Sequence, residues 1–289
     1  MKENDNKFKK GLVLEGGAMR GMFTCGVMDV FLENGIEFDG AAGISAGATF
    51  GCNYKSKQPG RALRYNKNYG RDPRYCSFRS LIRTGDLYGA DFCYRELPDV
   101  LDPFDRTTFK NNPMEFFVGA TDIRTGKCVY HRCIDGGRQD LEWMRASASM
   151  PLVSTPVSVD GYLLLDGGIT DSIPFEYMES IGYVRNVIVL TQPEGFVKKK
   201  SGISTLARII LHRYPEVARA MARRHEMYNR QLSEIKKREL AGTSFVIRPP
   251  APLGIRRTEK DPAELERVYD IGRRTAKEAL PGVKRFFGI

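Results

Sequence analysis

Histidine is scarce in this chain, which contains only three among 289 residues. His212 and His225 stand among arginines in a basic stretch, and we interpret both as parts of solvent-facing surfaces. His131 does not follow a glycine-marked strand end either. A Ser-His-Asp triad therefore has no candidate base, and any serine chemistry needs a different partner.

The chain also lacks long apolar runs and paired cysteines. No run approaches the roughly 18 apolar residues that span a bilayer, and Met1 to Lys10 is polar, without the apolar stretch of a secretory signal. The six cysteines are scattered without a Cys-x-x-Cys pair, which indicates reduced thiols. We therefore expect a cytoplasmic protein, in peripheral contact with a membrane at most.

One cluster invites a metal interpretation. Cys128, His131 and Cys133 lie close together in the sequence, but no fourth ligand lies near them. Structural zinc sites have specific ligand spacings that this group does not reproduce. The alternative is a strand with buried small residues, so we predict no metal and no cofactor.

The composition is ordinary for a globular protein, but the basic charge is concentrated. The net charge is +10; Lys55–Arg83 holds nine Lys or Arg against one acid, and Lys198–Arg238 holds twelve against three. Such segments favour a surface that meets phosphates of lipid headgroups or nucleic acid, although either could be only a solvated face. No linker is evident, so we expect one domain over 1–289, with a core at 11–192 and a mostly helical extension at 193–289.

Two strand-turn-helix units open the chain. Gly11–Leu14 leads into a glycine turn and an apolar helix that stops at Gly35, and Phe38–Tyr54 repeats the plan around Ser45. Such units predict an α/β fold whose sheet is parallel and covered by helices. Lys55–Asp105 interrupts the alternation with loops and short helices, either as a cap over a site or as a surface excursion.

The remaining chain predicts further strands and helices. Strands are expected at 115–121, 127–131, 157–159, 162–165, 184–191 and 244–248, and helices at 140–149, 174–181 and, as one or two, 216–240. Asp160-Gly161 is typical of a two-residue hairpin turn. From Ile203 onward the chain is expected to be mostly helical, and a last helix begins at Asp261 with Glu264 completing a capping box.

Three glycine-marked turns each follow a predicted strand, at 16–21, 43–47 and 166–168. In a parallel sheet such turns gather along one edge, where ligands bind. Ser45, held in Gly-x-Ser-x-Gly, offers a nucleophile, and Asp166 offers a base. The turn after Leu14 offers backbone N–H donors. A Ser-Asp dyad is the simplest interpretation.

In combination these motifs resemble the patatin-like phospholipase family, in particular its bacterial cytoplasmic branch. The resemblance spans about residues 11 to 192, and four stretches carry it: Glu15–Gly21, Gly43–Gly47, Arg145–Pro151, and Asp166–Gly168 with Pro174 following. It implies a three-layer α/β/α fold and hydrolysis of acyl esters.

Residue roles follow from the same resemblance. Ser45 would attack the ester carbonyl, and Asp166 would accept its proton and later activate water. The N–H groups of Gly16, Gly17 and Ala18 would form the oxyanion hole. The motif residues that support this site are Arg20, Gly21, Gly43, Gly47, Gly167 and Gly168.

Two positions depart from the family pattern, and two arginines have alternative readings. Ala18 replaces a glycine, which preserves the donor unless the backbone there needs a positive φ, and Asp171 stands where relatives often carry an uncharged residue. Arg20 could hold an anionic headgroup or brace the loop, or bond to neighbouring carbonyls. For Arg145 we favour a bracing role.

The leading hypothesis is a lipid acyl hydrolase that acts on phospholipids or lysophospholipids at an anionic membrane surface. A soluble acyl ester, thioester or acyl-transfer substrate is the nearest alternative. A non-catalytic module that binds phosphates or nucleic acid is the alternative of another class, and we do not expect nucleic acid because that leaves Ser45 and Asp166 unexplained. A dinucleotide site is excluded since Gly-x-Gly-x-x-Gly fails at Ala18.

Overall fold

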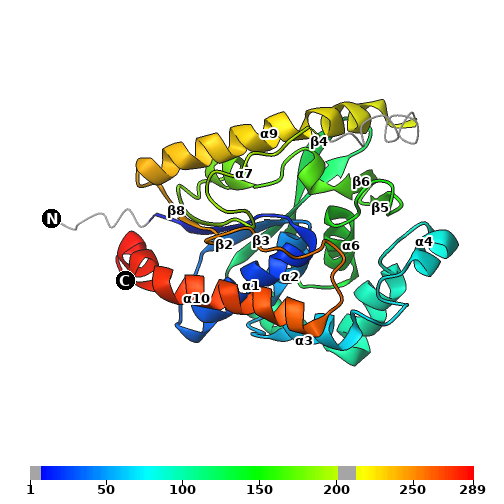
Figure 1. Cartoon of the computed structure of the whole chain (residues 1–289), viewed down its shortest axis with the longest axis horizontal. Helices are drawn as coiled ribbons and strands as arrows, with labels where there is room; N and C mark the ends of the chain where they lie inside the picture. Colours follow the sequence, from blue (N-terminus) through cyan, green and yellow to red (C-terminus); the bar gives the residue numbers. More distant parts are fainter. Residues whose placement is uncertain (1–7, 201–212) are drawn as a thin grey trace.

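The computed structural model describes residues 8–200 and 213–289, which form one mixed sheet between two layers of helices (Figure 1). The strand order is β5-β6-β3-β2-β1-β7-β8, and β4 pairs with β3. The strands are β1 (Lys10–Leu14), β2 (Gly40–Ile44), β3 (Glu115–Asp122), β4 (Lys127–Cys133), β5 (Val157–Val159), β6 (Tyr162–Asp166), β7 (Arg185–Val189) and β8 (Ser244–Ile247).

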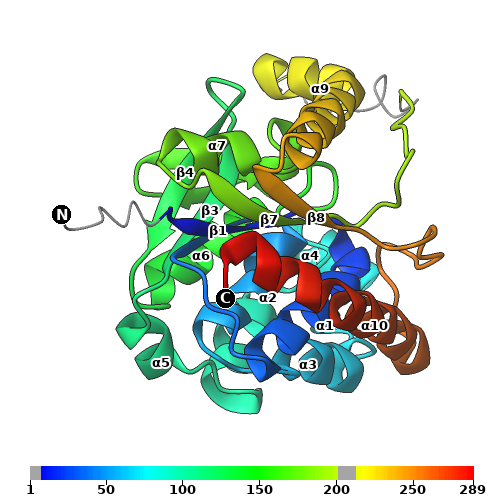
Figure 2. The same cartoon turned by 90° about the vertical axis from the view of Figure 1, so that its left-hand side faces the viewer.

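The helices cover both faces of the sheet, as Figure 2 shows. On one side lie α1 (Gly21–Glu33), α2 (Ala46–Lys55), α3 (Arg61–Tyr69), α5 (Arg106–Asn111), α6 (Arg138–Ser147) and α10 (Pro262–Phe287), and on the other lie α7 (Phe175–Ser180) and α9 (Pro215–Leu240). The remaining segments are α4 (Phe78–Thr84), the π-helical η2 (Phe92–Leu101) and the short turns η1 (Ala18–Arg20) and η3 (Gly167–Ile169). The predicted α/β fold with C-terminal helices is confirmed, although the beginning of the predicted helical region, Ile203 to His212, lies outside the described residues.

The sheet is parallel at its centre and antiparallel at one side. Parallel pairing joins β3, β2, β1, β7 and β8, whereas β6 and β4 run antiparallel to β3. Both β2 and β6 pair with β3 along consecutive stretches: Ile44 lies opposite Gly119, and Asp166 lies opposite Ala120. The carboxyl ends of β2 and β6 therefore meet head to head beside β3.

The C-terminal helices are integral to the fold. A Cβ on Gly26 of α1 would stand 2.1 Å from the Tyr269 carbonyl oxygen of α10, and a Cβ on Gly272 would stand 2.1 Å from that of Phe23. The two backbones thus touch where α1 crosses α10. The hydroxyl of Tyr269 also donates to the buried Asp29 at 2.6 Å.

Local turn chemistry is mostly as expected. Asp160 and Gly161 both adopt positive φ, 51° and 77°, so the predicted hairpin turn between β5 and β6 is confirmed. The capping box at α10 is wrong in one half. Asp261 caps the helix as expected, because its side chain accepts from the Ala263 N–H. The Asp261 N–H, however, donates to Glu259 of the preceding turn and not to Glu264. Glu264 instead pairs with Arg267.

Candidate active site

Ser45 occupies a strained turn between β2 and α2. Its φ and ψ are 55° and −119°, a region that L-residues rarely adopt and that is found at functional sites. The flanking positions require glycine because neighbouring backbone atoms leave no room for a Cβ. A Cβ on Gly43 would lie 2.3 Å from the Gly47 carbonyl oxygen, and a Cβ on Gly47 would lie 2.3 Å from that of Leu14. The predicted strand-turn-helix around Ser45 is confirmed.

Ser147, at the end of α6, fixes this turn. The Ser45 N–H donates to Ser147 Oγ at 2.8 Å, and that hydroxyl donates to the Gly119 carbonyl oxygen at 2.6 Å. Ser147 is buried, so it ties the elbow to β3. Ser147 lies in Arg145–Pro151, one of the stretches that carry the family resemblance, but the sequence assigns it no role. The tertiary contact shows that it holds the serine turn.

Asp166 ends β6 and is buried. Its Oδ1 accepts from the Gly168 N–H at 2.8 Å, while its buried Oδ2 has no hydrogen-bond partner within residues 8–200 and 213–289. Burial raises the pKa of Asp166, whereas the positive charge of Arg224 and the nearby Ser45 hydroxyl lower it. The structure thus brings Ser45 next to a buried carboxyl that retains one unused oxygen.

The glycine turn after β1 faces the same place. The Gly16 N–H donates to the Ser172 carbonyl oxygen at 3.4 Å, whereas no backbone or side-chain acceptor within the described chain takes the N–H of Gly17 or Ala18. Two of the three predicted donors are therefore available. Ala18 adopts φ 51°, so this position does need the conformation that alanine resists.

Glu15, the residue between β1 and this turn, holds the turn in place through two hydrogen bonds. It is buried, and its two oxygens accept from the Thr191 N–H at 2.5 Å and from the Tyr228 hydroxyl at 2.6 Å. Burial raises the pKa of Glu15, which these hydrogen bonds partly offset. Tyr228 belongs to α9, so the C-terminal segment holds the turn in place.

Asp171 has a related role. Its Oδ1 accepts from Gln231 Nε2 of α9 at 2.6 Å, and the Tyr130 hydroxyl donates to its other oxygen. The Gln231 side chain also bonds to Ser172 and Ile173. Asp171 therefore joins α9 to the loop after Asp166.

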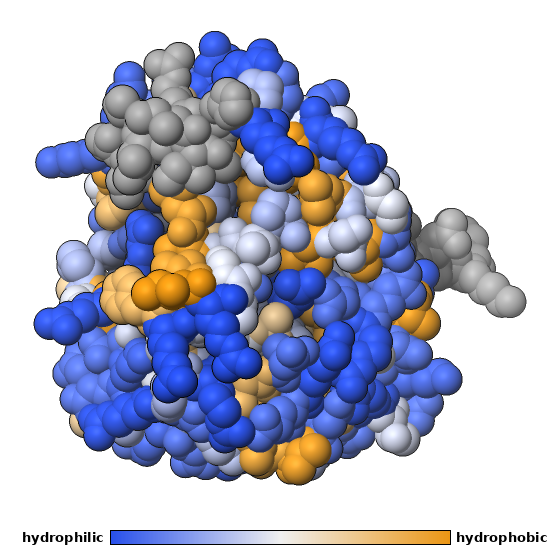
Figure 3. Space-filling model, turned by 90° about the vertical axis from the view of Figure 1, so that its right-hand side faces the viewer, coloured by the Kyte–Doolittle hydropathy of each residue, from blue (hydrophilic) through white to orange (hydrophobic). Residues whose placement is uncertain are grey.

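A cavity of about 640 Å³ opens beside Ser45. Its lining is mostly apolar and comes largely from α2, α3, α6 and the segment between α3 and β3; it includes Phe50, Tyr65, Tyr88, Tyr94, Leu97 and Met144. Figure 3 views the face that carries α4, where apolar side chains gather between hydrophilic ones. The volume and lining suit an acyl chain.

Four cations surround a smaller cavity of about 70 Å³ that Ser45 and Asp166 also line: Arg20, Lys198, Arg224 and Arg257. The interpretation of the basic α9 segment as a purely solvated face is wrong for Arg224, which is partly buried and donates Nε to the Gly168 carbonyl oxygen. It is also wrong for His225, which lines the larger cavity and is 21% exposed. The hydrophobic pattern of one helix cannot show that a polar stretch turns toward a site on another element.

The two arginines left open by the sequence also differ. The Arg20 side chain makes no hydrogen bond with any described residue, and its Nε is buried, so bonding of the guanidinium to carbonyls of the described neighbouring loops is wrong. Arg145 pairs with Glu142 of its own helix at 2.6 Å and lines the large cavity, so its bracing of a loop stays a prediction. No hydrogen bond joins His131 or His225 to Ser45 in the described parts of the chain, and His212 lies outside them.

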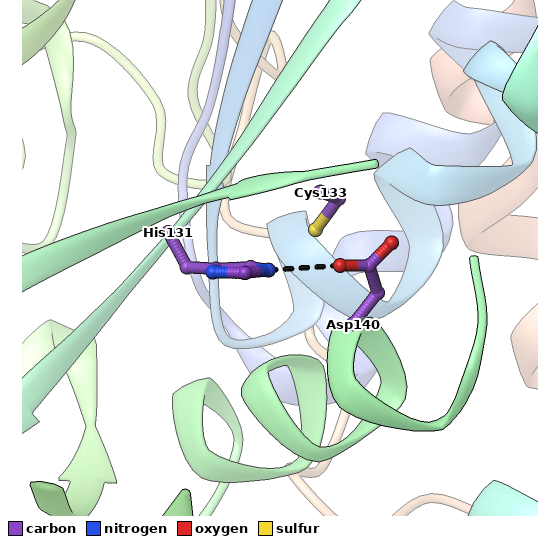
Figure 4. A group of neighbouring side chains, drawn as sticks. All are labelled: His131, Cys133 and Asp140. Carbon is purple, nitrogen blue, oxygen red and sulfur yellow. Dashed lines mark hydrogen bonds and ion pairs between the residues drawn. The ribbon is translucent and has the colours of Figure 1, made fainter. Parts of the chain in front are cut away.

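The candidate metal cluster forms a different group from the one considered. His131, Cys133 and Asp140 converge, with ligand atoms within 4.8 Å of one another, and Cys128 is not among them (Figure 4). His131 Nε2 lies 2.8 Å from Asp140 Oδ1. The other oxygen of Asp140 accepts three backbone N–H groups, those of Ile134, Asp135 and Gly136. These protein donors account for the buried carboxylate, which ties the loop before α6 to the first turn of that helix.

Comparison with known proteins identifies the class. The family model described as patatin-like phospholipase matches residues 12–178, and one described as a domain of unknown function (DUF6363) matches residues 214–288. The match to the patatin-like phospholipase model supports an acyl-ester hydrolase. The chain belongs to the patatin-like phospholipase family, which contradicts the non-catalytic alternative.

Several proteins are similar to this chain. The uncharacterized protein YjjU of Escherichia coli (strain K12) is 28% identical over 280 residues, which cover 91% of this chain and 74% of that protein. The lysophospholipase nte1 of Aspergillus niger is 27% identical over 177 residues, which cover 60% of this chain but 11% of that protein. The crystal structure of VipD from Legionella pneumophila aligns with a TM-score of 0.46 at 12% identity, over 95% of this chain and 67% of that one.

Proposed function

We propose that this protein is a serine lipid acyl hydrolase that cleaves carboxylic ester bonds of phospholipids or lysophospholipids through Ser45 and Asp166. The observation that carries the proposal is the buried, unused Asp166 Oδ2 beside the elbow serine at the mouth of an apolar cavity. A strained nucleophile turn and an adjacent base are what acyl transfer requires. The similarity to fungal proteins named lysophospholipases supports a lipid substrate.

The reaction follows from these groups. Ser45 Oγ attacks the ester carbonyl while Asp166 accepts the hydroxyl proton, and the N–H groups of Gly17 and Ala18 stabilise the oxyanion. The tetrahedral intermediate expels the alcohol, which takes the proton, and leaves an acyl-serine. Asp166 then removes a proton from water, which attacks the acyl-serine; the proton passes from Asp166 to Ser45 Oγ as the bond to the acyl group breaks and the fatty acid is released.

An exposed serine provides the matched control for the test. Fluorophosphonate should label the wild type and Ser158→Ala, since Ser158 is an exposed residue of β5, but not Ser45→Ala. Asp166→Asn should abolish turnover while the circular dichroism spectrum is unchanged. Equal ester hydrolysis by Ser45→Ala and the wild type would contradict the proposal.

The nearest alternative keeps the dyad and replaces the lipid with a soluble acyl ester, thioester or acyl acceptor. The rate on short-chain esters in solution, compared with the rate on liposomes, separates the two. A steep rise above the aggregation threshold of the lipid supports lipid hydrolysis. Equal rates below and above it would favour the soluble substrate.

We also propose peripheral contact with an anionic membrane surface in the cytoplasm. No helix among the described residues combines the length and apolarity that crossing a membrane requires. On α4, Phe78 and Ile82 are 77% and 88% exposed and lie one turn apart, with Arg79 and Arg83 beside them. Exposed apolar side chains flanked by arginine suit an interfacial helix. Leu87 and Tyr88, which follow α4, line the large cavity, so this contact would lie near its entrance.

Contacts between the two segments that match family models, 12–178 and 214–288, support one functional unit over the whole chain. Tyr228 and Arg224 of α9 contact Glu15 and Gly168 in the first segment, and α10 packs against α1. We propose that neither segment forms this site alone.

A further inference from the structure

The small cavity beside Ser45, here called the basic chamber, is lined by the proposed catalytic groups and also by four cations, which the proposed hydrolytic step does not use. Six residues line both it and the large apolar cavity: Ala18, Ser45, Met150, Lys198, Arg224 and Arg257. The two cavities therefore adjoin at the nucleophile. One is apolar, and the other is surrounded by cations.

The four cations of this chamber lack the carboxylate partners that other basic residues of the protein have. On α9, Arg230 pairs with Glu176 at 2.8 Å and Arg238 pairs with Glu179 at 2.8 Å. By contrast, the four chamber cations make no ion pair within 4.0 Å among the described residues. They are Arg20, Lys198, Arg224 and Arg257. Residues 201–212 contain no Asp or Glu.

The two carboxyls that line the chamber in the described part of the chain have other partners or roles. Glu15 is bonded to Thr191 and Tyr228, and Asp166 is bonded to Gly168 and faces Ser45. The positive charges consequently repel one another. Burial together with the charges of Arg224, Arg257 and Arg20 lowers the pKa of Lys198 to about 8. The four cations outnumber the two lining carboxyls, and a bound anion would offset their mutual repulsion.

The chain holds Lys198 in place for this role. Its N–H donates to Asn229 Oδ1 of α9 at 2.8 Å, and Asn229 Nδ2 donates back to its carbonyl oxygen at 3.0 Å. Its ammonium lies 4.9 Å from the ring centroid of Tyr228. The position is therefore built by two side chains of α9 rather than left to a flexible surface lysine.

We propose that Lys198, Arg224 and Arg257, together with Arg20, bind the phosphate of the substrate, and that this site selects lysolipids whose headgroup is a phosphate monoester over those that carry choline. This inference rests on the proposed function and names its substrate class. In a glycerolipid the ester and the phosphate are a few bonds apart, so the acyl chain, ester and phosphate fit the large cavity, Ser45 and the basic chamber in turn.

The selection against choline follows from the same residues. A quaternary ammonium needs an aromatic face or a carboxylate. The aromatic side chain that lines the chamber, Tyr228, already has the Lys198 ammonium over its ring; of the two lining carboxyls, Glu15 is hydrogen-bonded through both oxygens, and Asp166 is the proposed base for Ser45. Lys199 and His225 at the large cavity add further positive or neutral groups. Arg224 and Arg257 belong to the segment that matches DUF6363, which would thus supply headgroup selectivity.

The test compares three esters with one acyl chain in nonionic detergent: lysophosphatidate, lysophosphatidylcholine and monoacylglycerol. For the wild type, kcat/KM on lysophosphatidate should exceed that on monoacylglycerol by about tenfold or more, as expected for charge-assisted hydrogen bonds. Arg257→Gln should reduce this ratio about fivefold through KM. Arg257 makes no hydrogen bond with another described residue, so its loss should not unfold the protein. Arg223→Gln, an exposed neighbour of Arg224, should keep the wild-type ratio.

The outcomes separate the two proposals. If none of the three esters is cleaved, the proposed hydrolase function fails. If all are cleaved at similar rates, or if Arg257→Gln leaves the ratio unchanged, the phosphate site is overturned while hydrolysis stands. A readout without turnover is the thermal stability of Ser45→Ala, which lysophosphatidate should raise more than lysophosphatidylcholine does. Equal stabilisation by inorganic phosphate would assign the chamber to a free anion instead of a headgroup.

Discussion

The hydroxyl of Tyr228 donates a hydrogen bond of 2.6 Å to Glu15, across 213 residues of sequence. Glu15 also accepts from the Thr191 N–H, so this buried carboxyl joins β1, the end of β7 and α9. The glycine turn that follows Glu15 supplies the available N–H groups beside Ser45. The geometry of the candidate oxyanion hole therefore depends on a helix outside the segment that matches the patatin-like family.

Tyr228→Phe should weaken both the fold and the site. It leaves a buried oxygen of Glu15 without its donor, which lowers the free energy of unfolding by about 1–3 kcal/mol. The activity should fall more than the stability explains, because the Gly17 and Ala18 donors shift. Urea denaturation and ester kinetics measure the two effects. Tyr214→Phe is the control, since no hydrogen bond of the Tyr214 hydroxyl exists among the described residues; equal effects of both variants would contradict the role of Tyr228.

Asp166→Asn should stabilise the protein at neutral pH while it removes activity. Burial raises the pKa of Asp166 in the folded state above 3.8, the usual pKa of an aspartate side chain. The folded state then binds more protons than the unfolded state between these two pKa values, so the contribution of Asp166 to stability falls as the pH rises through that window. The variant should gain about 1 kcal/mol at pH 7, a usual size for removing such strain. The gain should vanish below pH 3.8, and a gain independent of pH would contradict this explanation.

The preference for a phosphate-bearing substrate should weaken at alkaline pH. Lys198 has a pKa of about 8, so it loses its charge above that pH, whereas the arginines keep theirs. KM for lysophosphatidate should rise above pH 8, and KM for monoacylglycerol should not. The charged and titratable groups that face Lys198 are Arg20, Arg224, Arg257, Glu15 and Tyr228. Lys198→Gln should raise KM and remove its pH dependence; a retained dependence would assign the titration to another group.

Ala18→Gly should relieve backbone strain. A positive φ costs an L-residue roughly 1–2 kcal/mol, which the substitution relieves. Glycine also raises the conformational entropy of the unfolded chain, and this destabilises the folded state by about 0.4–1 kcal/mol and so offsets part of the gain. The free energy of unfolding should rise by about 0.5 kcal/mol, with activity retained because the backbone donor is the same. Ala263→Gly, in the exposed first turn of α10, should instead lower it. Loss of stability in Ala18→Gly would show that the positive φ carries no strain.

Phe78→Ser combined with Ile82→Ser should reduce binding to anionic vesicles about tenfold, since each exposed side chain offers 1.5–3 kcal/mol of burial as an upper value. Hydrolysis of a short soluble ester should persist. Val184→Ser is the control: Val184 is 46% exposed but precedes β7 at the amino end of the strand, away from Ser45. Vesicle co-sedimentation measures both, and equal losses would contradict a specific role for α4.

Much of the candidate site was predictable because its requirements are local. The Ser45 turn needs glycine on both sides since neighbouring carbonyl oxygens leave no room for a Cβ at Gly43 or Gly47. The geometry of such a turn restricts which residue types can occupy a few consecutive positions, so the turn can be recognised from the sequence alone. The hairpin at Asp160-Gly161 was predictable for the same reason.

The sequence by itself thus determined the α/β class, the strained serine turn and the aspartate that ends a later strand. Only the tertiary structure decided that β6 runs antiparallel to β3 and meets β2 end to end. It also decided that Arg224 of a strongly basic helix turns inward to Gly168, and that Asp171 is bonded to Gln231. Backbone turn chemistry depends on neighbours in sequence, whereas strand partners and the inward face of a polar helix depend on packing between distant segments.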